Sequence, residues 1–445
     1  MQNRDFERKI YQKMLQWKRE KDGHTALLIK GARRIGKSTV AEMFAKREYE
    51  SYLLIDFAFA SKEVLELFEN VADLDSFFMG LQLHYNVRLT PRKSVIIFDE
   101  VQLCPKARQA IKLLVKDHRF DYIETGSLLS IKKNVKDILI PSEETRLTMY
   151  PMDYEEFLAA LGNTVTVQFL KDAFENKTPF KGAHRRLMQD FRLYMAVGGM
   201  PQAVNEYLET KDLSRVDGVK REILELYMDD FRKIDPSGKA GKLLKSIPAQ
   251  LSKNTNRYKV SSVIKGATTD RLADVLADME DSLVVNFAHH SDDPNVGLAL
   301  NMDSSQFKIF LCDTGLFVTL AFWDKDFTDN VIYKKLVNDK LKVNLGYVYE
   351  NAVAQILRSN GNELFFHTFP TESGKHNYEI DFLLSKGNKL SPVEVKSSSY
   401  KTHTSLDAFC QKYSSRIAER YLIYSKDLAK EEQTTFLPIY MAVCL

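Results

Sequence analysis

The first 150 residues alternate short apolar segments with longer amphipathic ones. Four apolar runs, each too short for a helix, predict strands at 25–30, 52–57, 94–99 and 121–125. The stretches between them, rich in Leu, Lys and Glu, have helical periodicity, and a charged amphipathic helix is predicted at 4–20. Strands that alternate with helices predict a parallel sheet covered by helices on both faces.

The pattern is helical from about residue 151 to 234 and then becomes mixed. Between about 240 and 310, short helices alternate with strand signals, which favours a small winged-helix unit. The last hundred residues begin with a predicted helix at 345–358 and continue with a strand near Leu364. Two further strands, at 378–384 and 391–396, indicate a separate C-terminal domain.

A glycine-rich loop follows the first predicted strand and precedes a helix. Its sequence, GARRIGKS, matches G-x-x-x-x-G-K-[ST], in which glycines let backbone N–H groups point at phosphate oxygens. Lys37 is predicted to bind the β and γ phosphates, and the Ser38 hydroxyl to bind magnesium. The predicted nucleotide-binding residues are Gly31, Ala32, Arg33, Arg34, Ile35, Gly36, Lys37 and Ser38, with Thr39 as a secondary contact. ATP and Mg²⁺ are the cofactors that this loop indicates.

The third predicted strand ends in two adjacent carboxylates. Asp99 is expected to hold magnesium, directly or through water, while Glu100 orients and polarises the attacking water. A buried strand that ends this way is the second half of a phosphate-loop ATPase site.

Together these motifs resemble bacterial and archaeal ATP-binding proteins in which an AAA-type ATPase domain precedes a C-terminal domain of nuclease-like fold. The resemblance covers nearly the whole chain. Its marks are GARRIGKS, Phe98-Asp99-Glu100, Thr125-Gly126-Ser127, YPMDYEEFL at 150–158, Gly198-Gly199-Met200-Pro201 and Asp313-Thr314-Gly315-Leu316.

The resemblance implies roles for further residues of the ATPase site. Thr125 or Ser127 would sense the γ-phosphate, although either could be an ordinary turn residue. Arg146 would stabilise charge on the γ-phosphate, including in trans. The alternative is an ordinary surface arginine in a loop, and Arg33 and Arg34 compete for the same role.

A second charged set lies in the last hundred residues and resembles the PD-(D/E)xK nuclease superfamily. Glu379 and Asp381 precede a turn, and Glu394 and Lys396 follow it, so a hairpin would bring them together. The resemblance implies that Asp381, Glu394 and Glu350 bind a metal ion and that Lys396 is the catalytic lysine. The alternatives are charges on a solvated hairpin, or a scaffold that only binds DNA or docks a partner.

The predicted fold class is α/β, with a parallel P-loop sheet, a helical and winged-helix middle region and a restriction-endonuclease-like C-terminal domain. The predicted domains are an AAA-like ATPase at 1–150, a helical lid at 151–235, a winged-helix-like domain at 236–325 and a nuclease-like domain at 326–445.

Composition narrows the classes of partner and compartment. Lys and Arg number 63 and Asp and Glu 60, so the net charge of +3 does not by itself indicate nucleic acid. Any DNA contact would be local, and a candidate set is Lys253, Arg257, Tyr258, Lys259 and Lys265. The four cysteines show no CxxC spacing, and neither a signal peptide nor a membrane span is apparent, which favours a cytoplasmic protein.

Two functions follow as hypotheses. In the first, ATP binding and hydrolysis control a metal-dependent, nuclease-like domain that acts on DNA. In the second, slow ATP turnover controls assembly or partner binding, self-association included, and the C-terminal domain is a catalytically inactive binding module.

Overall fold

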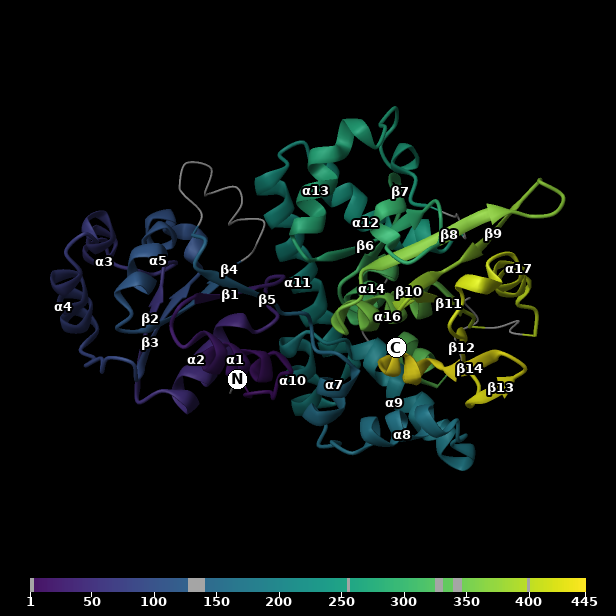
Figure 1. The fold of residues 1–445 in the computed structure, drawn as a ribbon, viewed down its shortest axis with the longest axis horizontal. Coiled ribbons are helices and arrows are strands. Elements are labelled where there is room, and N and C mark those ends of the chain that lie inside the picture. Colours follow the sequence, from purple (N-terminus) through teal and green to yellow (C-terminus); the bar gives the residue numbers. More distant parts are fainter. Residues whose placement is uncertain (1–3, 127–140, 254–256, 325–330, 339–345, 398–400) are drawn as a thin grey trace. The chain divides into compact units, whose positions relative to one another are not determined.

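The computed structural model describes residues 4–126, 141–253, 257–324, 331–338, 346–397 and 401–445. The chain divides into two compact units (Figure 1). The N-terminal unit comprises Met1–Pro151 with Asp281–Leu283, and the C-terminal unit comprises Met152–Glu280 and Val284–Leu445. Among the described residues, no helix combines the length and hydrophobicity that crossing a membrane requires.

A five-stranded, wholly parallel sheet forms the centre of the N-terminal unit, in the order β2-β3-β4-β1-β5. This confirms the parallel sheet predicted from the alternating pattern, while the edge strand β5 was not predicted. The elements are α1 (Ile10–Lys21), β1 (Ala26–Lys30), α2 (Lys37–Glu48), β2 (Ser51–Asp56), α3 (Lys62–Leu67), α4 (Leu74–Tyr85), β3 (Ser94–Asp99), α5 (Pro105–Asp117), β4 (Asp121–Gly126) and β5 (Glu144–Thr148).

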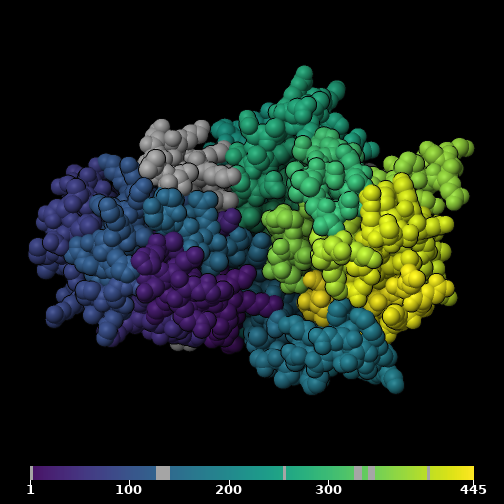
Figure 2. All heavy atoms as spheres, in the orientation of Figure 1, coloured from purple at the N-terminus to yellow at the C-terminus, as the bar shows by residue number. Residues whose placement is uncertain are grey.

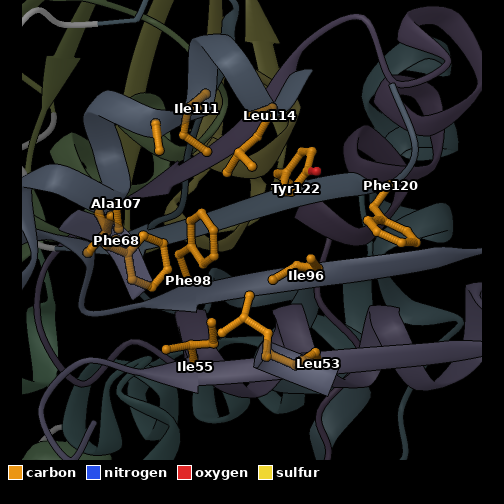
Figure 3. Close-up of a cluster of buried hydrophobic side chains, with 14 of the residues drawn as sticks. Leu53, Ile55, Phe68, Ile96, Phe98, Ala107, Ile111, Leu114, Phe120 and Tyr122 are labelled. Atoms are coloured by element: carbon orange, nitrogen blue, oxygen red, sulfur yellow. The ribbon is translucent and has the colours of Figure 1, made fainter. Parts of the chain in front are cut away.

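Helices cover both faces of this sheet, because successive side chains of a strand point to opposite faces. Ile96 and Phe98 of β3 and Tyr122 of β4 pack with Ile111 and Leu114 of α5 in one core (Figure 3). On the other face, α2 lies against β2, β3 and β4. Residues 95, 97 and 99 of β3 therefore point toward the side of α2, which is where the phosphate loop leads.

The C-terminal unit begins with helices and continues with two sheets. Its helices are α7 (Tyr154–Ala160), α8 (Thr166–Asn176), α9 (His184–Val197), α10 (Pro201–Thr210), α11 (Leu213–Ile234), α12 (Lys239–Leu251), α13 (Ala273–Asp281), α14 (Thr314–Ala321), α15 (Val331–Val337), α16 (Gly346–Ser359) and α17 (Thr404–Lys412). Its strands are β6 (Val285–Ser291), β7 (Met302–Leu311), β8 (Leu364–Pro370), β9 (Asn377–Ile380), β10 (Phe382–Lys386), β11 (Lys389–Val395), β12 (Arg420–Tyr424), β13 (Ala429–Glu431) and β14 (Thr434–Pro438).

One sheet of this unit joins strands from both sides of the predicted boundary at residue 325. Its order is β7-β6-β8-β9, and β6 pairs in parallel with β8. The four strands are labelled in one region of the ribbon view (Figure 1), and the green surface of the middle segment adjoins the yellow surface of the last residues in the space-filling view (Figure 2). The predicted winged-helix and nuclease-like domains thus share a sheet, because backbone pairing links segments far apart in the chain.

The second sheet has the order β10-β11-β12-β14-β13. The predicted hairpin is present, since β10 and β11 pair antiparallel with Phe382 opposite Val393. The single strand predicted at 378–384 is instead two strands. β9 belongs to the first sheet and β10 to the second, and Asp381 lies at the junction between them.

Candidate functional site

The predicted phosphate loop connects β1 to α2 in the N-terminal unit. Arg34 and Gly36 have left-handed backbone conformations, with φ of 68° and 93°, which turn the chain sharply before the helix. A Cβ atom on Gly31 would lie 2.5 Å from the carbonyl oxygen of Met149, so only glycine fits there. The loop residues Ala32 and Ile35 are buried, while the side chains of Arg33, Arg34 and Thr39 are exposed.

Lys37 begins α2 with its ammonium group buried beneath the loop. Its Nζ donates hydrogen bonds to the carbonyl oxygens of Ala32 at 2.9 Å and Gly31 at 3.1 Å. Burial lowers the pKa of Lys37 to about 8, although the carboxylates of Glu100 and Asp99 oppose this shift. A buried ammonium held by neutral carbonyl oxygens is prepared to exchange them for phosphate oxygens.

The order of the strands brings three predicted residues together. Because β4 lies between β1 and β3, the end of β4 lies beside both the phosphate loop and Asp99. The Oδ1 atom of Asp99 accepts a hydrogen bond from Ser38 Oγ at 2.8 Å and another from Thr125 Oγ1. Of the two predicted sensor residues, Thr125 is therefore part of the site, and Ser127 lies outside the described residues.

These oxygens suit magnesium, which prefers carboxylate and hydroxyl ligands and keeps several waters. The Ser38 hydroxyl and the Asp99 carboxylate are in direct contact, so a single ion could contact both. We conclude that the residues present fit the ion predicted to accompany ATP.

Glu100 directly follows Asp99 and has a left-handed backbone, with φ of 52° and ψ of 45°. Non-glycine residues rarely adopt this conformation, and it often marks functional positions. The Nε2 of Gln102 donates a hydrogen bond to the Glu100 carboxylate. Sequence reasoning missed Gln102, and its spacing of two from Glu100 is the only signal that could have indicated it.

Arg8 is a second residue that the sequence did not mark. Its Nη1 donates to the carbonyl oxygen of Ile35 in the phosphate loop at 2.8 Å, and its Nη2 donates to that of Tyr150 at 2.7 Å. It precedes α1, in a segment predicted to be helical. Arg8 thus fixes the outer side of the loop, a role that only the tertiary structure reveals.

Arg146 lies on β5 and is half exposed. Its Nε donates to Glu144 at 2.6 Å, and Glu144 also pairs with Arg108 at 2.9 Å. Within the N-terminal unit, the Arg146 guanidinium therefore pairs with a carboxylate of its own strand. Its predicted role in trans is considered below.

In the C-terminal unit, the predicted metal-binding residues gather around a lysine that the sequence did not indicate. Lys308 of β7 has its Nζ 3.6 Å from Glu350 and 3.8 Å from Asp381, and it donates a hydrogen bond to Glu379. Lys396 pairs with Glu394 at 2.8 Å. The sequence placed Lys308 in another domain, so its part in this cluster was not foreseen.

Among the described residues, the set of His, Cys and carboxylate side chains that lies close enough to hold a metal is His290, Asp292 and Asp303. The N–H of Thr368 donates to His290 Nε2 at 3.1 Å, so the imidazole proton resides on Nδ1, which faces Asp292 at 3.0 Å. The nitrogen that faces Asp292 is thus a donor and not a metal ligand.

The candidate DNA-binding set is only partly exposed. Lys253, Arg257, Lys259 and Lys265 are exposed, but Tyr258 is buried and donates its hydroxyl to the carbonyl oxygen of Leu243 at 2.9 Å. The inclusion of Tyr258 in this set is therefore wrong, because its ring is buried and packs beside Phe307.

Three segments of the chain match known family models. Residues 23–158 match an AAA domain, 188–326 match a domain of unknown function, DUF8612, and 345–442 match another, DUF4143. Residues 23–158 form an AAA domain. The AAA domain contains the whole site built above, from Gly31 to Arg146, apart from Arg8. No curated protein matches the chain significantly.

Two solved structures resemble the chain distantly. The Walker-type ATPase PABY2304 of Pyrococcus abyssi has 16% identity and a TM-score of 0.43, covering 71% of this chain and 96% of its own. Cdc6p from Pyrobaculum aerophilum has 10% identity and a TM-score of 0.25, covering 75% of this chain and 95% of its own. Both TM-scores lie below 0.5, so neither structure adds to what the site geometry says.

Proposed function

We propose that the AAA domain binds ATP with magnesium and hydrolyses it. The observation that supports this most directly is the hydrogen bond between Ser38 and Asp99 at the mouth of the phosphate loop. It joins the two halves of an ATPase site that lie 61 residues apart in the chain. Glu100, the expected catalytic carboxylate, directly follows Asp99.

Each residue has a task that its surroundings support. The loop N–H groups and Lys37 would bind the phosphates. Ser38 and Asp99 would hold the magnesium ion, which supplies positive charge to the phosphates when it is bound. Glu100 would accept the proton of the attacking water, and Thr125, beside Asp99, would contact the γ-phosphate end of the nucleotide.

The test separates nucleotide binding from hydrolysis. Lys37→Ala should abolish binding of a fluorescent ATP analogue, whereas Glu100→Gln should preserve binding and lower the hydrolysis rate by about 10²-fold or more. Lys46→Ala is the matched control, since Lys46 lies on the same helix and pairs with Glu42 at an exposed position. Equal hydrolysis by wild type and Glu100→Gln would disprove the proposed role of Glu100.

We further propose that Arg146 acts between copies of the chain. Its side chain is 51% exposed and pairs with Glu144 of the same strand, so a neighbouring nucleotide could compete for it. If so, specific ATPase activity should rise with protein concentration in wild type and not in Arg146→Ala. Activity that is independent of concentration in both would rule this role out.

For the C-terminal unit we favour the binding-module hypothesis over the nuclease hypothesis, because a lysine lies among the expected metal ligands. DNA is the proposed partner. ATPase rates should then change when DNA is added, while plasmid and single-stranded DNA remain intact with Mg²⁺ or Mn²⁺. Cleavage that disappears in Lys396→Ala would restore the nuclease hypothesis.

A further inference from the structure

The carboxylate cluster of the C-terminal unit is built from several separate elements. Glu350 comes from α16, Glu379 from β9, and Asp381 from the junction between β9 and β10. Lys308 reaches all three from β7, and only 5% of its side chain is exposed. A single buried ammonium group thus lies among three carboxylates from separate parts of the chain.

The ionisation of the cluster agrees with this arrangement. Burial lowers the pKa of Lys308, but Glu379, Glu350 and Asp381 outweigh burial and raise it above its ordinary value. Burial raises the pKa of Glu350 to about 8, against the opposing effect of Lys308. The three carboxylates therefore hold Lys308 in its charged form.

The cluster does not fit a divalent metal as it stands. Mg²⁺ needs oxygen ligands about 2.0–2.1 Å from the ion, but the expected carboxylates are not gathered closely enough to be such a set in the described part of the chain. Asp381 Oδ2 accepts the N–H of Val395 at 2.7 Å, and its Oδ1 faces Lys308. Glu394 is engaged by Lys396.

Glu394 of β11, which lies close enough to Asp381 to feel its charge, offers one further potential ligand atom. Oε2 of Glu394 is buried and has no hydrogen-bond partner among the residues that the structure describes, an arrangement that is costly unless the carboxylate is protonated or paired. Burial raises the pKa of Glu394, against the effect of Lys396. The cluster therefore has the carboxylate oxygens of a metal site, but its cation is the ammonium group of Lys308 and not a metal ion.

We propose that Lys308 is the resident cation of this cluster and that it excludes divalent metal from the site formed by Glu350, Asp381 and Glu394. Lys308 ties β7 to α16 and to the β9–β10 junction without an ion. The inference is independent of ATP hydrolysis, because every residue in it lies in the C-terminal unit.

Removal of the lysine charge should convert the cluster into a metal site. Lys308→Met keeps most of the side-chain volume and leaves three carboxylates without their cation, which favours a divalent ion in its place. Mn²⁺ binding would be measured on the full chain by electron paramagnetic resonance, without nucleotide. All variants would carry Asp99→Asn to remove the ATPase metal ligand. Lys308→Met should bind Mn²⁺ at least about tenfold more tightly than the Asp99→Asn parent.

Two controls make the result specific. Lys386→Met removes an exposed lysine of the same unit, which pairs with Glu419, and should gain no Mn²⁺ affinity. Adding Asp381→Asn to Lys308→Met should remove the gain. Mn²⁺ should also raise the unfolding temperature of Lys308→Met and leave that of the parent unchanged.

Two results would overturn the proposal. The first is a folded Lys308→Met protein that gains no Mn²⁺ affinity. The second needs no lysine variant and holds even if Lys308→Met fails to fold: a parent chain that binds one Mn²⁺ and loses it on Asp381→Asn would show that metal displaces Lys308. Failure of ATP hydrolysis would affect neither measurement.

Discussion

The ammonium group of Lys37 is buried against two carbonyl oxygens of its own loop, and its pKa is about 8. Phosphate binds the protonated form, so affinity for ATP should be constant below this pKa and fall above it. We expect a decrease of roughly tenfold per pH unit above about 8.

Calorimetry in two buffers of different ionisation enthalpy would measure the linked proton. Binding at pH 9 should take up close to one proton per ATP, and binding at pH 7 close to none. Equal proton uptake at both values would show that Lys37 does not titrate in this range.

Gln102 donates a hydrogen bond to the carboxylate of Glu100, and the backbone of Glu100 is left-handed. Gln102→Ala removes this hydrogen bond, and we expect kcat to fall about tenfold with little change in KM. Gln102→Asn should recover less than half of the loss, because its amide is one methylene shorter. A change confined to KM would mean that Gln102 acts on nucleotide binding.

At the scale of elements, a buried ion-pair network joins α5 to the sheet. Arg108 of α5 pairs with Glu144 of β5 at 2.9 Å and lies 3.5 Å from Glu124 of β4. Both carboxylate oxygens of Glu124 are buried, beside Glu144 and Arg108. Burial raises the pKa of Glu124 well above its ordinary value, and Arg108 counteracts the shift.

Arg108→Met should therefore destabilise the N-terminal unit by about 3 kcal/mol, since it removes the cation beside the buried carboxylate of Glu124. A folded-state pKa above the unfolded one means that stability falls as pH rises between the two values. The loss in Arg108→Met should accordingly be larger at pH 8 than at pH 5.5. Urea unfolding at both values tests this, with Lys112→Met on the same helix as control.

At the scale of the whole molecule, the chain forms two compact units, of which the first contains the described residues of the proposed nucleotide site. A ligand stabilises the folded state of the unit to which it binds. Magnesium and a non-hydrolysable ATP analogue, at about 100 times the dissociation constant, should raise the AAA unfolding transition by roughly 5–11 °C. Differential scanning calorimetry should show an unchanged second transition. Equal shifts of both transitions would indicate that the units unfold together.

The sequence by itself determined the parallel sheet and predicted residues of an ATPase site that the structure brings into contact, among them Ser38, Asp99 and Thr125. Local signals sufficed there, because apolar runs identify buried strands and the phosphate loop is a contiguous segment whose chemistry depends on its own backbone. Asp99 and Glu100 were identifiable for the same reason, since they directly follow a contiguous apolar run that predicts a buried strand.

Only the tertiary structure decided the contacts between distant segments. Arg8 reaches the phosphate loop across 27 residues, and Asn351 of α16 binds β7 across 40. Lys308 was assigned to a separate domain because no local pattern shows that β6 pairs with β8. Strand pairing and buried charge depend on the whole fold, so the resident cation of the carboxylate cluster became visible only when the sheets were assembled.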